Sequence, residues 1–262
     1  MNLQLIGKNA LVCGSSQGIG KAAAIELAQL GANVILVSRT AAKMAAIIKQ
    51  LDRRAPGQDH SFLVADFTDS ADLRKKVLGL VNRHPVHILV NNTGGPAAGA
   101  IMDADEADFM QAFHNHIICN HLLVGLVTPG MKAAGYGRII NIISTSVKQP
   151  IEGLGVSNTI RAAVANWAKT LASELGPYKI TVNNVLPGST DTERLRSLIQ
   201  DRAQRAGTTT DKIIEQMQNY IPLRRFAEAA EVGAAVAFLA SPAASYINGI
   251  NLPVDGGQTK SL

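Results

Sequence analysis

The chain has 262 residues, of which 47% are hydrophobic, and a formal net charge of +5. This length suits one large α/β domain with a buried core. The two cysteines, Cys13 and Cys119, argue against a disulfide scaffold, and no group of Cys and His has the spacing of a metal site. We expect both thiols to pack among apolar side chains.

Short β-branched runs alternate with longer helix-like segments along the chain. Seven such runs, joined by segments long enough for crossover helices, predict a mostly parallel sheet with helices on both faces. Pro129 falls late in the helical segment that begins near Asp103, where we expect it to kink or end the helix. The predicted strands are Asn9–Cys13, Asn33–Val37, Ser61–Ala65, His87–Val90, Arg138–Ile143, Ile180–Val185 and Ile250–Val254.

The first predicted strand leads into a glycine-rich turn and a helix. The segment ALVCGSSQGIG places Gly14, Gly18 and Gly20 between an apolar run and a helical pattern. Such a turn presents backbone N–H groups and a helix N-terminus to a pyrophosphate. A Cβ there would block the tight turn or the approach of the phosphates. The pattern therefore predicts nucleotide binding.

Residues at the ends of the next strands suit the same ligand. Arg39 follows the second strand, where its charge would attract a 2′-phosphate, so we expect NADPH rather than NADH. Asp66 ends the third strand and is placed to meet an adenine edge or to cap the following helix. After the fourth strand, the amides of Asn91 and Asn92 can bridge neighbouring strand ends, and Gly94 leaves room for the cofactor.

The least regular part of the chain follows the Pro187–Gly188 turn that ends the sixth predicted strand. Residues 190–225 form two charged helical pieces around AGTTTD. Ligands of open parallel sheets bind at the carboxyl ends of the strands, where this insertion begins. We therefore expect residues 190–225 to be a substrate lid, with a decorative insertion as the alternative.

Targeting signals are not found in the sequence. No apolar run approaches the roughly 18 residues of a membrane span, and the first residues lack the basic and apolar regions of a signal peptide. We therefore expect a cytoplasmic protein with no membrane partner. The basic residues are dispersed, so we expect no nucleic-acid partner, with binding of nucleic acid or a charged surface as a further alternative.

Five motifs in register resemble the short-chain dehydrogenase/reductase family, and the 3-oxoacyl-acyl carrier protein reductase type within it. They are GSSQGIG, NNTG, GRIINIIS, ITVNNVLPG and SYINGINLPVDGG. The resemblance implies a single Rossmann-type, doubly wound domain over residues 1–262, an NAD(P) cofactor, hydride transfer to or from a carbonyl or alcohol, and a homotetramer or dimer. By position it places cofactor contacts on Gly14, Ser16, Gln17, Gly18, Ile19, Gly20, Arg39, Asp66, Asn92, Gly94, Arg161, Pro187 and Gly188.

The chain departs from the family at its catalytic residues. The family's site holds Asn, Ser, Tyr and Lys, and the serine matches Ser144. Thirteen residues after Ser144, at the tyrosine position, stands Ser157, and four residues further, at the lysine position, stands Arg161. The asparagine position falls on His116. Many NADPH users of the family carry a basic residue where this chain has Gln17.

These departures break the usual proton relay. A carbonyl that accepts a hydride needs a proton, which a tyrosine of pKa ~10 beside a lysine can supply. A serine is a far weaker acid, and Arg161 stays protonated. His116, with an ordinary pKa near ~6.5, is the best replacement acid, directly or through a water. Its alternative role is that of a hydrogen-bonded histidine on a buried helix.

Two further hypotheses follow. The chain is either a reductase of a ketone such as a 3-oxoacyl thioester with an atypical proton donor, or a nucleotide-binding protein that acts as regulator or partner subunit. The alanine-rich face of the helix from about Val156 to Leu175 is expected to pair across a two-fold axis. Close packing of that face within one subunit is the alternative.

Overall fold

A computed structural model describes residues 1–261. Seven parallel strands form one sheet in the order β3-β2-β1-β4-β5-β6-β7. Every predicted strand is present within two residues of its expected bounds, and the predicted α/β fold is confirmed. The strands are β1 (Asn9–Cys13), β2 (Asn33–Ser38), β3 (Ser61–Val64), β4 (Ile88–Asn91), β5 (Gly137–Ile142), β6 (Ile180–Pro187) and β7 (Asn251–Val254).

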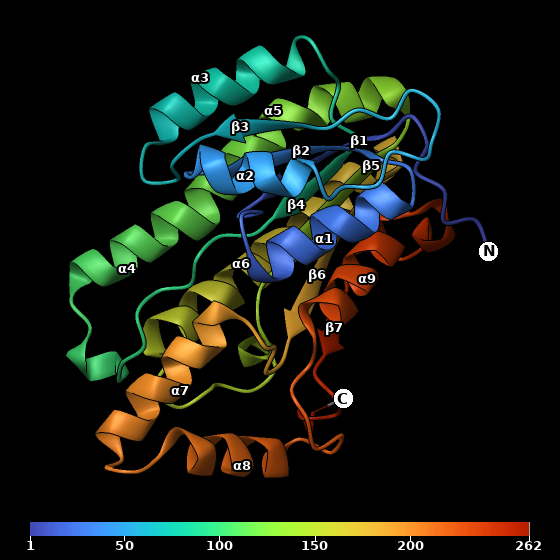
Figure 1. The fold of residues 1–262 in the computed structure, drawn as a ribbon. Coiled ribbons are helices and arrows are strands. Elements are labelled where there is room, and N and C mark those ends of the chain that lie inside the picture. Colours follow the sequence, from blue (N-terminus) through green and yellow to red (C-terminus); the bar gives the residue numbers. More distant parts are fainter. Residues whose placement is uncertain (262) are drawn as a thin grey trace.

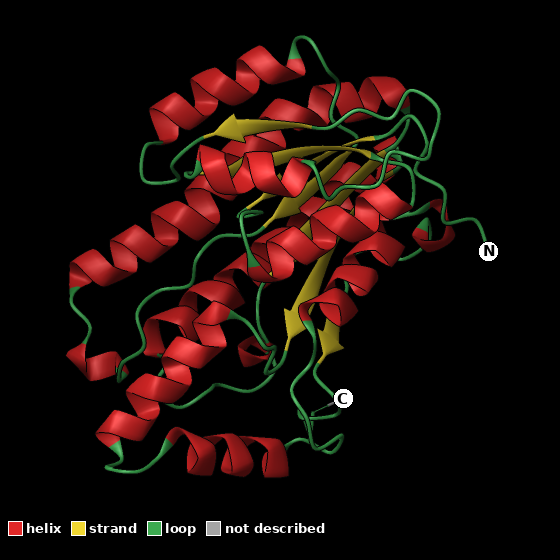
Figure 2. Ribbon diagram, viewed as in Figure 1, coloured by secondary structure: helices red, strands yellow, loops and turns green. Residues whose placement is uncertain are grey.

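Helices cover both faces of this sheet, as Figure 1 and Figure 2 show. Side chains of α1, α2 and α9 join one buried cluster with the strands, while those of α3, α5 and α6 join the other. The helices are α1 (Gly18–Gln29), α2 (Ala41–Ile48), α3 (Ser70–Val81), α4 (Glu106–Phe113), α5 (Cys119–Ala134), α6 (Gly155–Leu175), α7 (Glu193–Arg205), α8 (Thr210–Tyr220) and α9 (Ala229–Ala240).

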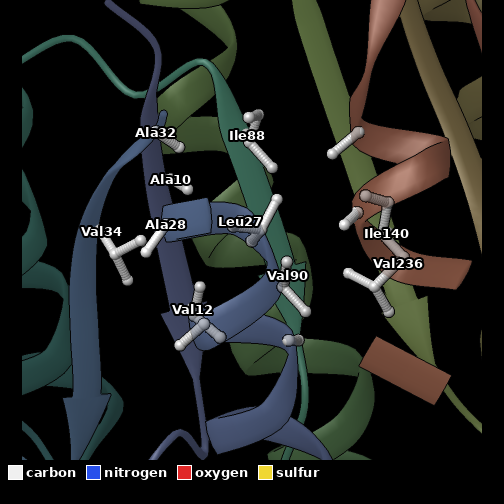
Figure 3. Packing of buried hydrophobic residues seen from close by; sticks show 14 of the residues in the cluster. Ala10, Val12, Leu27, Ala28, Ala32, Val34, Ile88, Val90, Ile140 and Val236 are labelled. Atoms are coloured by element: carbon white, nitrogen blue, oxygen red, sulfur yellow. The ribbon is translucent and has the colours of Figure 1, made fainter. Parts of the chain in front are cut away.

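The buried cluster that contains α1 fixes the position of the glycine turn relative to the sheet. Leu27 and Ala28 of α1 pack on strand residues such as Val12 and Val90 (Figure 3). The helix α9 packs closely against α1 at Gly233, where a Cβ would stand only 2.9 Å from the backbone of Ala22. Close packing of this kind gives α1 one position on the sheet.

Cys13 and Cys119 are both buried free thiols in the buried cluster of α3, α5 and α6, as expected. Burial raises the pKa of Cys13 above its ordinary value and that of Cys119 to about 11, so both remain protonated.

The helix between β4 and β5 differs from the prediction. It runs on past Pro129 to Ala134 and ends at Gly135, which adopts the left-handed conformation. Pro129 therefore does not end the helix, and the expected kink at this residue stays a prediction. A separate irregularity is the π-helical turn, His114–Ile118, between α4 and α5. Single π-turns inside α-helices often occur at functional sites.

This same helical run, Glu106–Ala134, is long and apolar enough to cross a membrane by length and composition alone. The sequence contains no uninterrupted apolar stretch of that length, which is why the pattern did not predict it. Part of this run packs in the buried cluster of α3, α5 and α6, through Leu123, Val127 and Met131. A core helix passes the same test, so length and composition alone do not identify a membrane span here.

The alanine-rich face of α6 turns largely into the chain itself. Ala165, Ala168 and Ala172 are buried in the described structure, whereas Ala162 is exposed. Packing within one subunit, the alternative considered above, therefore accounts for most of this face.

Candidate active site

The glycine turn at the end of β1 is shaped by the chain around it. Gly14 and Gly18 have φ of 58° and 55°, a region that side chains with a Cβ rarely adopt. At Gly20, φ is ordinary, but a Cβ would stand 2.3 Å from the Gly14 carbonyl oxygen. The Asn92 amide closes the turn by donating to the carbonyls of Cys13 (3.3 Å) and Gly14 (3.2 Å).

The turn leaves the N-terminus of α1 open for an anion. Its N-cap residue, Gln17, makes no capping hydrogen bond with its side chain, and the first turn carries no acidic residue. Free N–H groups and the helix dipole favour negative charge at this point. A cavity of about 530 Å³ begins here, and its lining includes Gln17, Lys21 and Lys43 together with Arg196, which is paired with Asp191 at 2.9 Å. These residues fit a phosphorylated nucleotide.

A basic group stands beside Gln17 after all. Lys43, in the first turn of α2, donates from Nζ to Gln17 Oε1 at 3.1 Å. Arg39, four residues earlier, is exposed after β2 and helps to hold the pKa of Asp66 below its ordinary value. The larger cause of that lowering is the hydrogen bond from the Thr68 N–H (3.0 Å). Lys43 was missed by the sequence reasoning, since it lies in α2 whereas Arg39 lies before that helix.

The alternative role of Asp66 as a helix cap is wrong. The helix α3 begins at Ser70, and its N-cap is Asp69, whose carboxylate accepts from the Asp72 N–H at 2.9 Å. The Asp66 side chain instead binds the turn before the helix. It remains at the end of β3, half-buried, with its carboxylate at the same edge of the sheet as the glycine turn.

Four asparagines in register bridge the strands that carry the site. Asn91 of β4 donates to Asn141 of β5 at 2.8 Å, Asn141 donates to Asn184 of β6 at 2.9 Å, and Asn184 donates to Asn251 of β7 at 2.8 Å. The expected bridging by Asn91 is thus present and extends over four strands. The other three members were missed, although each occupies a similar place in its strand.

The π-helical turn directs His116 toward the loop after β4. His116 is buried, and its Nδ1 lies 2.8 Å from the hydroxyl of Thr93. Burial and the nearby Arg161 cation lower the pKa of His116 to about 2, against a small opposite effect from the Gly94 backbone. The expected titration near ~6.5 is therefore wrong for this structure. At neutral pH the ring is an uncharged imidazole that can both donate and accept a hydrogen bond.

The two serines of the site lie after β5 and on α6. Ser144 is half-buried, and its hydroxyl accepts a hydrogen bond from the Ser146 N–H at 3.1 Å. Ser157 is buried in the first turn of α6, one turn before Arg161. Ser144 thus caps the short helical turn Thr145–Val147 and not the end of β5, and this acceptor role leaves its hydroxyl proton available for a ligand.

Arg161 is the most unusual group of the site. It is 8% exposed, donates from Nη1 to the Ile142 carbonyl at 2.8 Å, and leaves Nε without a partner. Burial and, to a lesser extent, the Arg194 cation lower its pKa to about 10, so it stays charged at neutral pH.

The segment after β6 lies beside the glycine turn and beside the loop after β4. The Pro187–Gly188 turn packs against Asp255, and a Cβ at Gly188 would stand 2.7 Å from that side chain. Thr192 caps α7 by accepting from the Leu195 N–H, and its methyl group is the nearest neighbour of a Cβ built at Gly18, at 3.4 Å. The helices α7 and α8 then lie beyond the ends of β6 and β7 (Figure 1).

The structure thus gathers the expected residues into two groups at the carboxyl edge of the sheet. The first surrounds the glycine turn, and the second joins His116, Gly94 and Arg161. Together with the doubly wound parallel sheet, they have the arrangement typical of nucleotide-binding proteins, whose ligands bind at the carboxyl ends of the strands.

Comparison with known proteins gives the family. A family model described as enoyl-(acyl carrier protein) reductase matches residues 14–259. The chain belongs to the short-chain dehydrogenase/reductase family. It is 34% identical over 264 residues to the 3-oxoacyl-[acyl-carrier-protein] reductase of Pseudomonas aeruginosa, covering 99% of this chain and 100% of that protein. It is 30% identical to an NADPH-dependent reductase of Bacillus subtilis, covering 97% and 99%.

Among solved structures, the chain is similar to an L-sorbose reductase from Gluconobacter frateurii complexed with NADPH and L-sorbose. The TM-score is 0.92 at 28% identity, and the match covers 100% of both chains. The likeness extends from the glycine turn to the segment after β6, so the seven-stranded fold and its helices are those of the family.

Proposed function

We propose that this protein is an NADPH-dependent oxidoreductase that reduces the carbonyl of a small molecule with an atypical proton donor. The family, the reductases among its relatives and the NADPH-bound structural neighbour support the reaction class. The observation that carries the proposal is the open N-terminus of α1 on a cavity of about 530 Å³. A ketone such as a 3-oxoacyl thioester is the proposed substrate.

The residues around the glycine turn would hold the cofactor. The N–H groups of the turn and of α1 suit the pyrophosphate, and Asp66 and Asn92 border the strand edge where the adenine and nicotinamide halves would lie. Arg39 and Lys43 place two cations near the outer end of the turn, which favours a 2′-phosphate. Lys43 thus provides the basic charge that Gln17 lacks.

The second group would serve the substrate. The bound cofactor supplies a hydride to the carbonyl carbon, and the substrate oxygen then needs a proton. Ser144 and Ser157 offer hydroxyl donors to this oxygen, and the Arg161 cation stabilises negative charge on it. The uncharged His116 imidazole can release a proton from one nitrogen while the other accepts one from Thr93, whose hydroxyl then regains a proton from solvent water. We propose that this relay, directly or through a water, replaces the missing tyrosine.

The test combines cofactor binding with turnover. NADPH binding is measured by cofactor fluorescence, and NADPH consumption is followed with a panel of 3-oxoacyl thioesters and small diketones. Turnover by the natural protein that falls by about 10²- to 10⁴-fold in His116→Ala supports the proposed relay. Unchanged NADPH affinity in that variant separates loss of chemistry from loss of the fold.

A double variant, Ser157→Tyr with Arg161→Lys, tests the alternative. If only this variant consumes NADPH, the natural protein is a nucleotide-binding regulator or partner subunit. The replacement of both relay residues is the observation that favours that second function. Failure of the natural protein to bind NADPH would refute both.

We further propose a lid and an assembly. The helices α7 and α8 would close over the substrate, since Thr192 already lies beside Gly18. Exposed apolar side chains on and before α4, namely Ile101, Met102, Met110 and Phe113, would lie in a dimer or tetramer interface in the cytoplasm. Light scattering that reports a monomer would refute the assembly.

A further inference from the structure

Two arginines meet in the second group without a carboxylate between them. Arg161 comes from α6 and Arg194 from the first turn of α7. Their Nη2 atoms lie 3.7 Å and 3.9 Å from the point where a Gly95 Cβ would stand. Each is anchored by one backbone carbonyl, Arg161 by Ile142 at 2.8 Å and Arg194 by Pro96 at 2.5 Å. The two guanidinium groups therefore border one space beside the loop after β4.

Arg161 is buried, whereas Arg194 is exposed at the edge of the same site. A buried charge is normally paired, and the nearby second cation repels it, so the arrangement is costly for Arg161 in the protein alone. The ion pairs of residues 1–261 include neither arginine. The carboxylate that acts on Arg194 is Asp201, two turns further along α7 and not in salt-bridge contact with it. The buried Nε of Arg161 has no hydrogen-bond partner in the described structure.

An anion in this space would satisfy both groups. Guanidinium groups bind carboxylates through paired N–H donors, and Arg161 still has unused donors at Nε and Nη2. The space lies at the loop Gly94–Pro96, and Arg161 acts on the buried His116 from the same side.

We infer that Arg161 and Arg194 together bind the carboxylate of an oxo-acid substrate. The inference rests on the proposed carbonyl reduction but replaces the 3-oxoacyl thioester with a free oxo acid as the substrate of that reaction. Because Arg194 belongs to α7, the substrate's own charge would draw the segment after β6 toward the site. Substrate recognition and closure would then use the same ion pair.

The experiment titrates 4-oxopentanoate and acetoacetate, each beside its neutral amide, into the protein saturated with NADP⁺, which cannot donate a hydride. Calorimetry measures the affinities. We expect the acids to bind at least ~10-fold more tightly than the amides, since charge-assisted hydrogen bonds are the stronger ones. Equal affinities, or no heat from the acids, would overturn the inference.

Two variants locate the effect. Arg194→Gln should weaken binding of the acids by about 10- to 100-fold and leave the amides unchanged. Arg202→Gln removes the same charge from an exposed position of the same helix and should change neither. Circular dichroism checks that both variants fold. Equal losses in the two variants would show a general charge effect and refute the specific site.

NADPH titrations of the same proteins identify the source of the anion. A cofactor phosphate, rather than a substrate carboxylate, would lose affinity in Arg194→Gln while the ratio of acid to amide affinity stayed the same. That result would overturn the inference. A natural protein that binds no NADPH would refute the proposed function instead, and the acid and amide titrations without cofactor would still report on the two arginines.

Discussion

Replacing Asn141 with leucine gives a quantitative test of the asparagine chain across β4–β7. Asn141 is fully buried in the middle of this chain, where it accepts from Asn91 and donates to Asn184. Leucine has a similar size and cannot make either bond. The substitution therefore leaves the Asn91 Nδ2 and the Asn184 Oδ1 without these partners, while Asn91 Oδ1 already lacks one.

The expected cost follows from these two groups. A buried polar group left without its partner costs about 1–3 kcal/mol, so Asn141→Leu should lower the free energy of unfolding by about 2–6 kcal/mol. Typical domains have only about 5–15 kcal/mol in total. The matched control is Asn251→Leu at the partly exposed end of the chain, which leaves only the Asn184 Nδ2 without its partner and should cost about 1–3 kcal/mol.

Urea unfolding followed by circular dichroism measures both variants. The midpoint should fall much further for Asn141→Leu than for Asn251→Leu, with similar slopes. NADPH affinity should also fall in Asn141→Leu, because Asn91 directly precedes Asn92, which holds the glycine turn. Equal midpoints for the two variants would refute the reasoning that the central amides are satisfied only by one another.

Three other predictions concern the site. Gly20→Ala should abolish NADPH binding, since its Cβ would meet the Gly14 carbonyl at 2.3 Å, whereas Gly79→Ala in the open surface of α3 should bind normally; fluorescence titration compares them. Arg39→Gln and Lys43→Gln should each weaken the affinity for NADPH by about 10-fold and leave the affinity for NADH unchanged. Equal losses of affinity for both cofactors would contradict the 2′-phosphate assignment. The His116 ring should stay uncharged down to about pH 4 in NMR titrations. Its lowered folded pKa means that the unfolded chain binds more protons, so this group contributes stability that is lost as the pH falls below ~6.5.

Much of the first group was predictable from the sequence. The three glycines, Arg39 and Asn92 each follow an apolar run, and their places after successive strands bring them to one edge of a parallel sheet. Lys43 was not predictable in this way, because its contact with Gln17 joins two segments that are 26 residues apart. The position of a residue directly after an apolar run predicts its place at the strand end, and this pattern can be recognised from neighbouring residues alone.

The second group depended on contacts between distant segments. His116 was identified by counting back from the motif around β5. The pKa expected for it was wrong, because burial and the Arg161 charge lower the pKa only in the folded chain. Arg194 has no sequence signal, as it is one of several arginines in a charged helix. It meets Arg161 because α7 packs back over the loop after β4.

The sequence by itself determined where the apolar strands and the helices lie along the chain. It also determined the glycine turn and the residue types at the relay positions. These features follow from short-range periodicity and from the steric demands of single residues. The tertiary structure alone decided which charges lie together and which polar groups are satisfied. The physical reason is that desolvation and Coulomb energies depend on distances between groups far apart in the chain, and those distances exist only after the sheet and its helices have packed.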